Sequence, residues 1–359
     1  MTTIDNKCTI YLDRNENQYG PSPACFKVLH ESNSDTLNIY SRDFSRGVKS
    51  ILSERLARDF GTTEDKILLS YGSEDLLKQA VQCYINKGDK ILIPSCSWWY
   101  YKKIAEEAEG LNIQYPILEG DHTFYYDIEQ MIEIYNREKP KLVLISSPNN
   151  PTGNRLETKQ LKYVLERMSD TLVILDEAYL LFDESYKTDP VELVNKHPNL
   201  IIIRTFSKYY ALAGIRTGFA FLGDNHERFK LLNARYLGFN RLSEIIAIAA
   251  LDSPEYYNSI GRKMADDKEM LYNELNRLPG FHAYISYANF ILVKIPPEVK
   301  DPLNKFLTER KMIVKFMNED GLNSHIRITI GTHSQNSLLL KLVQAFMHKE
   351  IKHELVLGV

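Results

Sequence analysis

Several features of other protein classes are missing from this sequence of 359 residues. Its only cysteines, Cys8, Cys25, Cys83 and Cys96, lie far apart without a nearby group of histidines, which argues against a disulfide framework and a zinc site. No apolar run reaches the roughly 18 residues of a membrane span, and the first residues lack the apolar segment of a signal peptide. We therefore expect a soluble protein of the reducing cytoplasm, without a metal.

An excess of one charge is also missing. The formal net charge is −3, so charge alone does not attract the chain to nucleic acid or to an acidic membrane, and we expect small-molecule partners. Internal repeats, low-complexity tracts and a linker rich in Pro, Gly or Ser are absent as well. Because the chain exceeds the usual size of a single core, we expect two domains that meet within a compact body.

Apolar strands and amphipathic helices alternate over the first two thirds of the chain. Strands are predicted near 66–70, 90–94, 112–115, 141–145, 171–175, 201–203 and 218–222, with helices in the gaps. This alternation indicates an α/β fold with a mostly parallel, doubly wound sheet, whose ligands bind at the carboxyl ends of the strands. Later, long helices and short strands indicate a smaller α/β unit. We predict an N-terminal arm (1–40), a large domain (41–242) and a small C-terminal domain (243–359).

One lysine lies between hydroxyl groups directly after an apolar strand. Lys208 follows Thr205 and Ser207, and Arg216 comes eight residues later. At the end of a strand, such a lysine could bind a phosphorylated aldehyde as a Schiff base, while the hydroxyls and the arginine hold the phosphate. That cofactor would be pyridoxal phosphate. Considered alone, however, Lys208 is more often a surface lysine in a loop.

Other predicted strand ends carry the remaining groups that this chemistry requires. Asp176 ends its strand, where a buried carboxylate needs a cation such as a pyridinium. Tyr179 and Asn150 could both donate to the ring oxygen of the cofactor. Ser73 and Glu74 open a helix whose unpaired amides suit a phosphate, although acidic residues in a first turn are also ordinary helix capping.

The sequence argues against two competing site types and leaves two interpretations of one aromatic residue. Asp176-Glu177 could be the metal carboxylates of a nucleotidase, but no Gly-x-x-x-x-Gly-Lys-Ser/Thr loop precedes them. No Gly-x-Gly-x-x-Gly follows the first strand, which weakens a dinucleotide site. Trp98 either fills the core at a strand-helix corner or stacks on a flat heteroaromatic ring.

Four spaced motifs resemble those of fold-type I pyridoxal-phosphate aminotransferases. They are Ser147-Pro-Asn-Asn-Pro-Thr-Gly153, Asp176-Glu-Ala-Tyr179, Thr205-Phe-Ser-Lys208 with Ala213-Gly-Ile-Arg216, and Arg327-Ile-Thr-Ile-Gly331. Within that family the chain is most similar to the histidinol-phosphate aminotransferases, through its opening arm 12–23 and the segment 286–290. The resemblance covers nearly the whole chain in order, and a chance match of so many motifs is very improbable.

The resemblance implies roles at the cofactor ring. Lys208 would form the Schiff base and then move the proton between the substrate's α-carbon and the cofactor. Asp176 would pair with the pyridinium, and Asn150 with Tyr179 would hold the ring oxygen. Trp98 stands where the family stacks an aromatic ring.

The resemblance also implies a phosphate site, a substrate site and a second subunit. The phosphate would lie among Ser73, Glu74, Thr205, Ser207 and Arg216. Tyr40 would reach it from the other subunit of a homodimer, so the active site would be shared. Arg327 would bind the anionic group of the substrate, and Tyr19 of the arm would close over it. Lys315 would also bind substrate, and it departs from the arginine usual in the subgroup.

The expected reaction is amino-group transfer between a small amine or amino acid, such as histidinol phosphate, and a 2-oxo acid, in ping-pong half-reactions. Because a lysine at 315 lacks the planar fork of arginine, it cannot bind an anion in the same bidentate way. The sequence therefore does not determine which substrate the protein uses. Alternatives are transamination of another amino acid in a specialised pathway, decarboxylation of an amino-acid phosphate, and a non-catalytic protein that binds the cofactor. The amino donor, the extent of domain closure and assembly beyond a dimer are not predicted.

Overall fold

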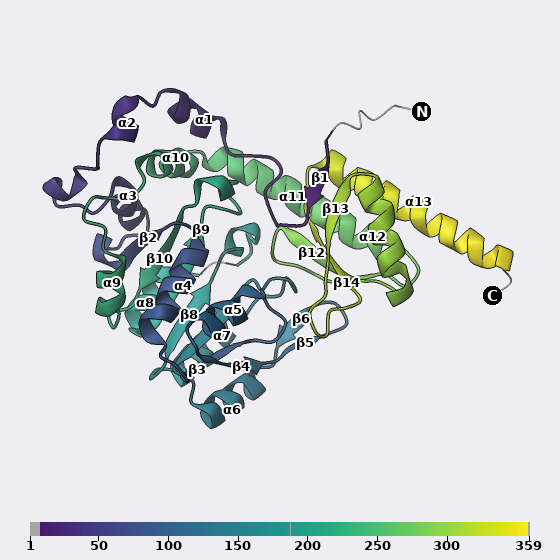
Figure 1. Cartoon of the computed structure of the whole chain (residues 1–359), viewed down its shortest axis with the longest axis horizontal. Helices are drawn as coiled ribbons and strands as arrows, with labels where there is room; N and C mark the ends of the chain where they lie inside the picture. Colours follow the sequence, from purple (N-terminus) through teal and green to yellow (C-terminus); the bar gives the residue numbers. More distant parts are fainter. Residues whose placement is uncertain (1–7, 187, 358–359) are drawn as a thin grey trace.

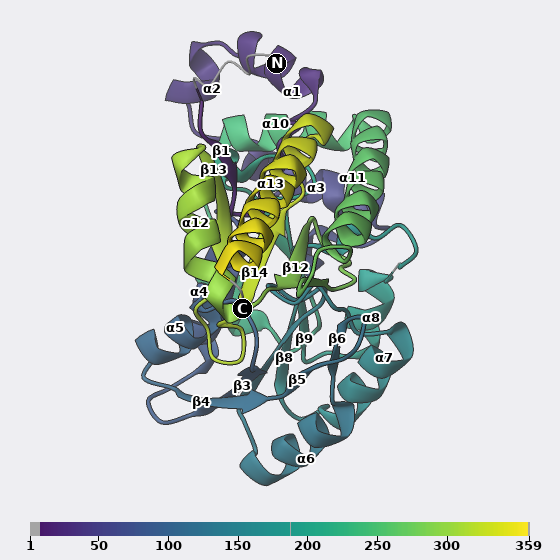
Figure 2. The same cartoon turned by 90° about the vertical axis from the view of Figure 1, so that its right-hand side faces the viewer.

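The computed structural model describes residues 8–186 and 188–357, with side chains up to residue 348. Figure 1 shows two sheets, each covered by helices, with the long helix α11 (Pro254–Leu275) running from one unit into the other. Figure 2, turned by 90°, shows the smaller sheet above the larger one. Within the described part of the chain, no helix is both long and apolar enough to cross a membrane.

The larger sheet has seven strands and is mostly parallel. Its spatial order is β2 (Ile67–Ser70), β10 (Gly218–Leu222), β9 (Leu200–Thr205), β8 (Leu172–Asp176), β7 (Leu142–Ser146), β3 (Lys90–Pro94) and β4 (Leu111–Tyr115). Only β10 runs antiparallel to its neighbours in this sheet. The predicted fold class, α/β with a mostly parallel sheet, is confirmed.

Both faces of this sheet are buried, which explains why its strands are apolar without polar alternation. In β8, Val173 and Leu175 pack on one face and Ile174 packs on the other. The first face is covered by α3 (Ile51–Asp59), α6 (Ile128–Glu138), α7 (Thr158–Arg167), α8 (Pro190–Lys196) and α10 (Arg241–Leu251). The second is covered by α4 (Ser73–Tyr84), α5 (Tyr100–Glu107) and α9 (Glu227–Asn233).

The smaller sheet has five strands and packs on three helices. Its order is β1 (Ile10–Leu12), β13 (Met312–Phe316), β14 (His325–Thr329), β12 (Phe290–Lys294) and β11 (His282–Ala283), and only β1 pairs in parallel. Its core lies against α12 (Lys300–Glu309), α13 (His333–Leu357) and the later turns of α11.

Three features differ from the sequence-based expectations. The predicted arm contains β1, which pairs with β13 and buries Leu12 completely, so residues 10–12 belong to the small sheet. Helix α10 falls in the predicted small domain, yet Ile246 and Ala250 pack with the large sheet. The change from one core to the other occurs within α11. Its first turn packs with the core of the large sheet through Tyr257, whereas Met264 packs with the core of the small sheet. The hairpin β5 (Ile117–Glu119) and β6 (Phe124–Tyr126) was not predicted.

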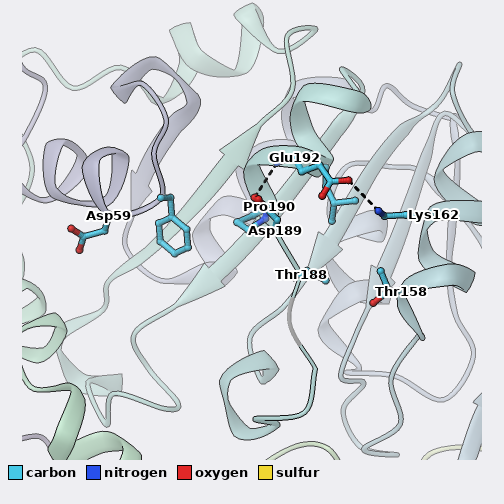
Figure 3. Close-up of a pocket in the computed structure, with 9 residues that line it drawn as sticks. Asp59, Thr158, Lys162, Thr188, Asp189, Pro190 and Glu192 are labelled. Carbon is cyan, nitrogen blue, oxygen red and sulfur yellow. Dashed lines mark hydrogen bonds and ion pairs between the residues drawn. The ribbon is translucent and has the colours of Figure 1, made fainter.

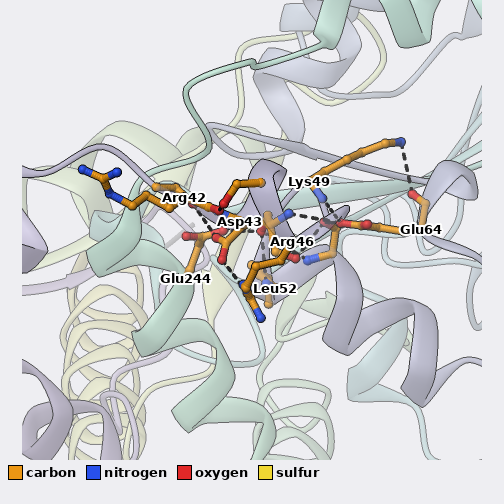
Figure 4. Close-up of polar contacts among 11 residues, drawn as sticks. Arg42, Asp43, Arg46, Lys49, Leu52, Glu64 and Glu244 are labelled. Atoms are coloured by element: carbon orange, nitrogen blue, oxygen red, sulfur yellow. Dashed lines mark hydrogen bonds and ion pairs between the residues drawn. The ribbon is translucent and has the colours of Figure 1, made fainter.

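Helices α1 (Pro23–His30) and α2 (Ser34–Asn38) follow β1 and lie beside α10. The next segment ends in a polar cluster at the start of α3 (Figure 4). The Oγ of Ser50 accepts the backbone N–H of Leu52 at 3.0 Å and donates to the carboxylate of Glu244. Glu64 accepts the backbone N–H of Lys49 at 2.8 Å. Burial raises the pKa of the Glu244 carboxyl to about 7, so a titratable group supports this helix start.

Candidate active site

The carboxyl ends of three parallel strands lie side by side at one edge of the large sheet. Ser146 of β7 is opposite Asp176 of β8, and Asp176 is opposite Ile203 of β9. Strand β9 ends at Thr205 and is followed closely by Lys208, so the sheet brings these polar residues to one place. The small sheet meets this edge, because the ring of Phe290 contacts that of Tyr179 with a centroid separation of 5.2 Å.

Lys208 lies just beyond β9 and is partly buried. Its Nζ donates to the backbone carbonyl of Arg14 at 3.0 Å and lies 5.8 Å from the ring centroid of Tyr179. Burial, with the positive charges of Arg327 and Arg216, lowers the pKa of this amine from 10.5 to about 8. A lysine with that pKa is partly unprotonated near neutral pH, so it can act as a nucleophile.

Asp176 presents a buried carboxylate at the end of β8. Its Oδ2 accepts from the hydroxyl of Tyr101 at 2.8 Å, and its Oδ1 accepts from the backbone N–H of Ala178 at 3.0 Å. Burial raises the pKa of Asp176 to about 6, although both hydrogen bonds act in the opposite direction. A cationic ring nitrogen beside this carboxylate would offset its desolvation, so the residue fits a pyridinium.

A buried arginine lies beside the two predicted donors to the ring oxygen. Arg327 Nη1 donates to Asn150 Oδ1 at 2.5 Å, and the other terminal nitrogen donates to the backbone carbonyl of Asp13. Burial raises the pKa of Tyr179, and the positive charge of Arg327 acts against this shift. Among the described residues none accepts from the buried Nε of Arg327. A buried guanidinium with an unused donor fits an anionic group of a substrate.

Several residues of the predicted phosphate site lie together where α4 begins. Arg216 Nη2 lies 3.7 Å from the carboxylate of Glu74. A Cβ at Gly72 would come 2.7 Å from the same Nη2, and one at Gly218 would come 2.7 Å from the backbone nitrogen of Ser73. Two glycines therefore allow the arginine and the helix start to approach each other. Unpaired helix amides beside a guanidinium form a cradle that fits a phosphate.

Two hydroxyls adjoin this cradle. Thr205 Oγ1 donates to Ser207 Oγ at 3.0 Å and accepts the backbone N–H of Ser207 at 3.1 Å, and both side chains are buried. The buried hydroxyl of Thr217 has no hydrogen-bond partner among the residues that the structure describes. Lysine, carboxylate, ring-oxygen donors and phosphate cradle thus all fit pyridoxal phosphate.

Two contacts of this site were missed in the sequence. Tyr101 is 3% exposed and binds Asp176, but in the sequence it is one apolar position of a helix, which does not distinguish it from a core aromatic. Asn15 Nδ2 donates to the Tyr179 hydroxyl at 3.0 Å, and nothing in the polar arm indicates which residue reaches the site. The ring of Trp98 lies edge-on to that of Tyr101, with centroids 5.6 Å apart.

Three predicted residues take no part in the hydrogen bonds described above. Tyr40 is 70% exposed. The ring of Tyr19 contacts Lys263 at 5.9 Å, and burial together with Asp267 raises the pKa of its hydroxyl. Lys315 is exposed and pairs with Arg327 across β13 and β14, so the two side chains share one face of the small sheet. The roles of all three stay predictions.

A separate hollow of about 500 Å³ lies on the large unit (Figure 3). It is lined by Asp59, Phe60, Thr158, Lys162, Thr188, Asp189, Pro190, Glu192 and Leu193. Three of its charged residues contact one another, because Lys162 Nζ lies 3.1 Å from Glu192 Oε1 and Asp189 accepts the backbone N–H of Glu192 at 3.0 Å. None of the predicted site residues lines this hollow.

Comparisons with known proteins agree with this chemistry. The family "Aminotransferase class I and II" matches residues 8–345. The chain is 31% identical over 343 residues to a histidinol-phosphate aminotransferase of Ruminiclostridium cellulolyticum, covering 95% of this chain and 93% of the relative. It is 33% identical over 342 residues to histidinol-phosphate aminotransferase 2 of Carboxydothermus hydrogenoformans, covering 94% and 89%.

A solved structure is similar over nearly the whole chain. The histidinol-phosphate aminotransferase of Sinorhizobium meliloti, in complex with pyridoxal 5'-phosphate, superposes with a TM-score of 0.85 at 23% identity, covering 96% of this chain and 92% of that one. The predicted family and the cofactor are confirmed. The chain belongs to the class I and II aminotransferases and is a pyridoxal-phosphate-dependent enzyme.

Proposed function

We propose that the enzyme transfers an amino group between a phosphorylated amine, histidinol phosphate or a related small amine, and a 2-oxo acid, in ping-pong half-reactions. The observation that carries the proposal is Lys208, whose pKa is lowered to about 8 beside the buried carboxylate of Asp176. Bound pyridoxal phosphate supplies an electron sink for the bond broken at the substrate's α-carbon. The relatives named above support the choice of amine.

The residues of the chain have separate tasks in this proposal. Asp176 would keep the ring nitrogen protonated, and Asn150 with Tyr179 would donate to the ring oxygen. Lys208 would hold the cofactor and would accept and return a proton at Nζ. Its low pKa suits this task, because a base works best when its pKa lies near the working pH.

An anionic substrate is supported by the cations on the small sheet. Arg327 is buried with an unused Nε donor, and Lys315 lies beside it across the strand pair. A buried guanidinium next to a second cation suits a carboxylate or a phosphate. The same pair could bind another amino acid, which leaves the specialised transaminase as the second candidate.

The test begins with Lys208→Ala. We expect this variant to lose both the visible absorption band of the lysine-bound cofactor and all turnover, because no other described group replaces Nζ there. The matched control is Lys268→Ala, since Lys268 is also a partly buried lysine with a pKa of about 8 and a 3.0 Å bond to a backbone carbonyl, that of Ala288, but it lies in α11. Full activity in Lys208→Ala would refute the proposal.

Substrate choice is tested by adding L-glutamate and histidinol phosphate separately to the holoenzyme. Loss of the visible band identifies the amine that donates, and the keto product identifies transfer. Release of CO₂ from an amino-acid phosphate would instead support decarboxylation. If the band forms but neither amine changes it, the histidinol-phosphate proposal is wrong and Lys315 is the first residue to examine.

We further propose a homodimer with shared active sites in a reducing cytoplasm. The exposed side chain of Tyr40 supports a role in a partner's site. The free thiols of Cys8, Cys25, Cys83 and Cys96 support a reducing compartment.

A further inference from the structure

Three consecutive residues of the N-terminal segment each contact a different residue of the active site. We name Asp13–Asn15 the arm strap. The carbonyl of Asp13 accepts from Arg327, the carbonyl of Arg14 accepts from Lys208 Nζ at 3.0 Å, and Asn15 Nδ2 donates to the Tyr179 hydroxyl at 3.0 Å. Two of these contacts use the backbone, so Asn15 alone contributes a side chain that substitution can test.

The strap is held firmly by the small sheet. It follows β1, which pairs with β13. The backbone N–H of Asn15 donates to Thr329 Oγ1 at 3.0 Å, and its carbonyl accepts from Asn289 Nδ2 at 3.0 Å. Asn15 is 1% exposed with φ of 56°, a left-handed conformation that asparagine adopts more readily than most residues. The amide is therefore placed on Tyr179 by a rigid support.

The direction of this hydrogen bond matters for Tyr179. A hydroxyl has one proton and two lone pairs, so an oxygen that accepts from Asn15 keeps its proton for another acceptor. Accepting a bond also makes the hydroxyl a stronger donor. The charged groups that act on Tyr179 are Arg327 and Asp176, and the amine of Lys208 lies over its ring. Burial raises the pKa of Tyr179, and the bond from Asn15 lowers it.

We propose that Asn15 is a positioning residue that directs the Tyr179 hydroxyl toward the ring oxygen of the cofactor and strengthens its donation. The inference rests on the proposed function, because it assigns Tyr179 to that oxygen. A stronger donor stabilises the ionised ring oxygen, which lowers the pH at which the visible band of the lysine-bound cofactor titrates. Asn15 thus sets the pH at which the substrate-free enzyme titrates, without contacting the cofactor itself.

The experiment is a spectrophotometric pH titration of the holoenzyme without substrate. Asn15→Asp keeps the size and the backbone conformation but replaces the donor by a carboxylate that accepts the Tyr179 proton. Asn15→Gly removes the donor without adding charge and tolerates the positive φ. In both variants we expect the pKa of the visible band to be higher by roughly half a unit to one unit, which is the effect of one hydrogen bond.

The control is Asn17→Ala. Asn17 Nδ2 also donates at 3.0 Å from a buried position in the arm, but to the backbone carbonyl of Tyr209, so the substitution loosens the arm and leaves Tyr179 bonded. The inference is supported if the pKa of the visible band is unchanged in Asn17→Ala and is higher in both Asn15 variants. No shift in Asn15→Gly, or an equal shift in Asn17→Ala, overturns it. A native protein without any visible band would overturn the proposed function as well.

Discussion

Burial moves the two central ionisable groups of the site in opposite directions. The pKa of Asp176 rises from 3.8 to about 6, and that of Lys208 falls from 10.5 to about 8. Both shifts have the same main cause, because desolvation disfavours the charged form of an acid and of a base alike. Hydrogen bonds to the carboxylate oppose the shift at Asp176, and the hydroxyl of Tyr101 provides one of them.

We therefore predict that Tyr101→Phe weakens cofactor binding and raises the pKa of Asp176 further. A hydrogen bond to a charged group contributes about 1.5 kcal/mol or more, which corresponds to roughly tenfold in affinity. The measurement is titration of the apoenzyme with pyridoxal phosphate, followed by absorbance. The low-pH limb of the activity profile should also move to higher pH.

The matched control for this substitution is Tyr115→Phe. The hydroxyl of Tyr115 is fully buried too and donates to the carbonyl of Leu144 at 3.1 Å, away from Asp176. Equal losses of affinity in the two variants would mean that Tyr101 acts through general packing, and the prediction would be wrong.

At the scale of elements, the start of α3 depends on a buried carboxyl of α10. Burial is the main reason that the pKa of Glu244 is raised from 4.5 to about 7, while Ser50 and Arg241 act against the shift and Asp43 adds to it. The folded state therefore binds more protons than the unfolded state between about pH 4.5 and 7. Stability contributed here is present at low pH and decreases as the pH rises through this window.

We predict that Glu244→Gln makes the protein more stable at pH 8 than the unmodified chain and flattens this decrease. The expected difference in the free energy of unfolding is on the order of 3 kcal/mol, since each unit of pKa is about 1.4 kcal/mol. Urea unfolding at pH 5 and pH 8 measures it. Glu269→Gln, at an exposed position within α11, is the control and should change little. The same pH dependence in Glu244→Gln as in the unmodified protein would contradict the prediction.

At the scale of the whole molecule, exposed apolar side chains occur in two stretches of the chain. Leu37, Tyr40 and Phe44 lie in or just after α2, and Leu231 and Tyr236 lie in or just after α9. The rings of Phe44 and Tyr236 lie 5.3 Å apart, which brings the two segments together. Exposed apolar groups in this number are typical of a subunit interface, and they support the proposed homodimer.

Co-expression of Lys208→Ala with Tyr40→Ala tests whether the sites are shared. If Tyr40 serves the partner's site, each mixed dimer contains one site with both substitutions and one intact site. Random pairing would then restore about a quarter of the native activity, although each variant alone is impaired. Sedimentation must show dimers throughout. Activity no higher than the sum of the two single variants would mean that Tyr40 does not complete a partner's site.

The sequence by itself determined the class of the large sheet and most of its site. Strands of near-continuous apolar residues alternating with helices form a parallel sheet, and parallel strands place their carboxyl ends at one edge. Asp176 and Lys208 could therefore be assigned to one site from chain order alone. Their chemistry, a carboxylate and a lysine among hydroxyls, indicated the cofactor.

Only the tertiary structure decided which other residues complete that site. Tyr101 and Asp176 are 75 residues apart, and Asn15 and Tyr179 are 164 apart. Neither pair shares a periodicity or a motif that would connect them. Likewise, residues 10–12 become a strand because β13 offers an edge, and the arm has no strand pattern of its own. Local pattern determines an element and its buried face, whereas contacts between distant elements depend on how the sheets and helices pack.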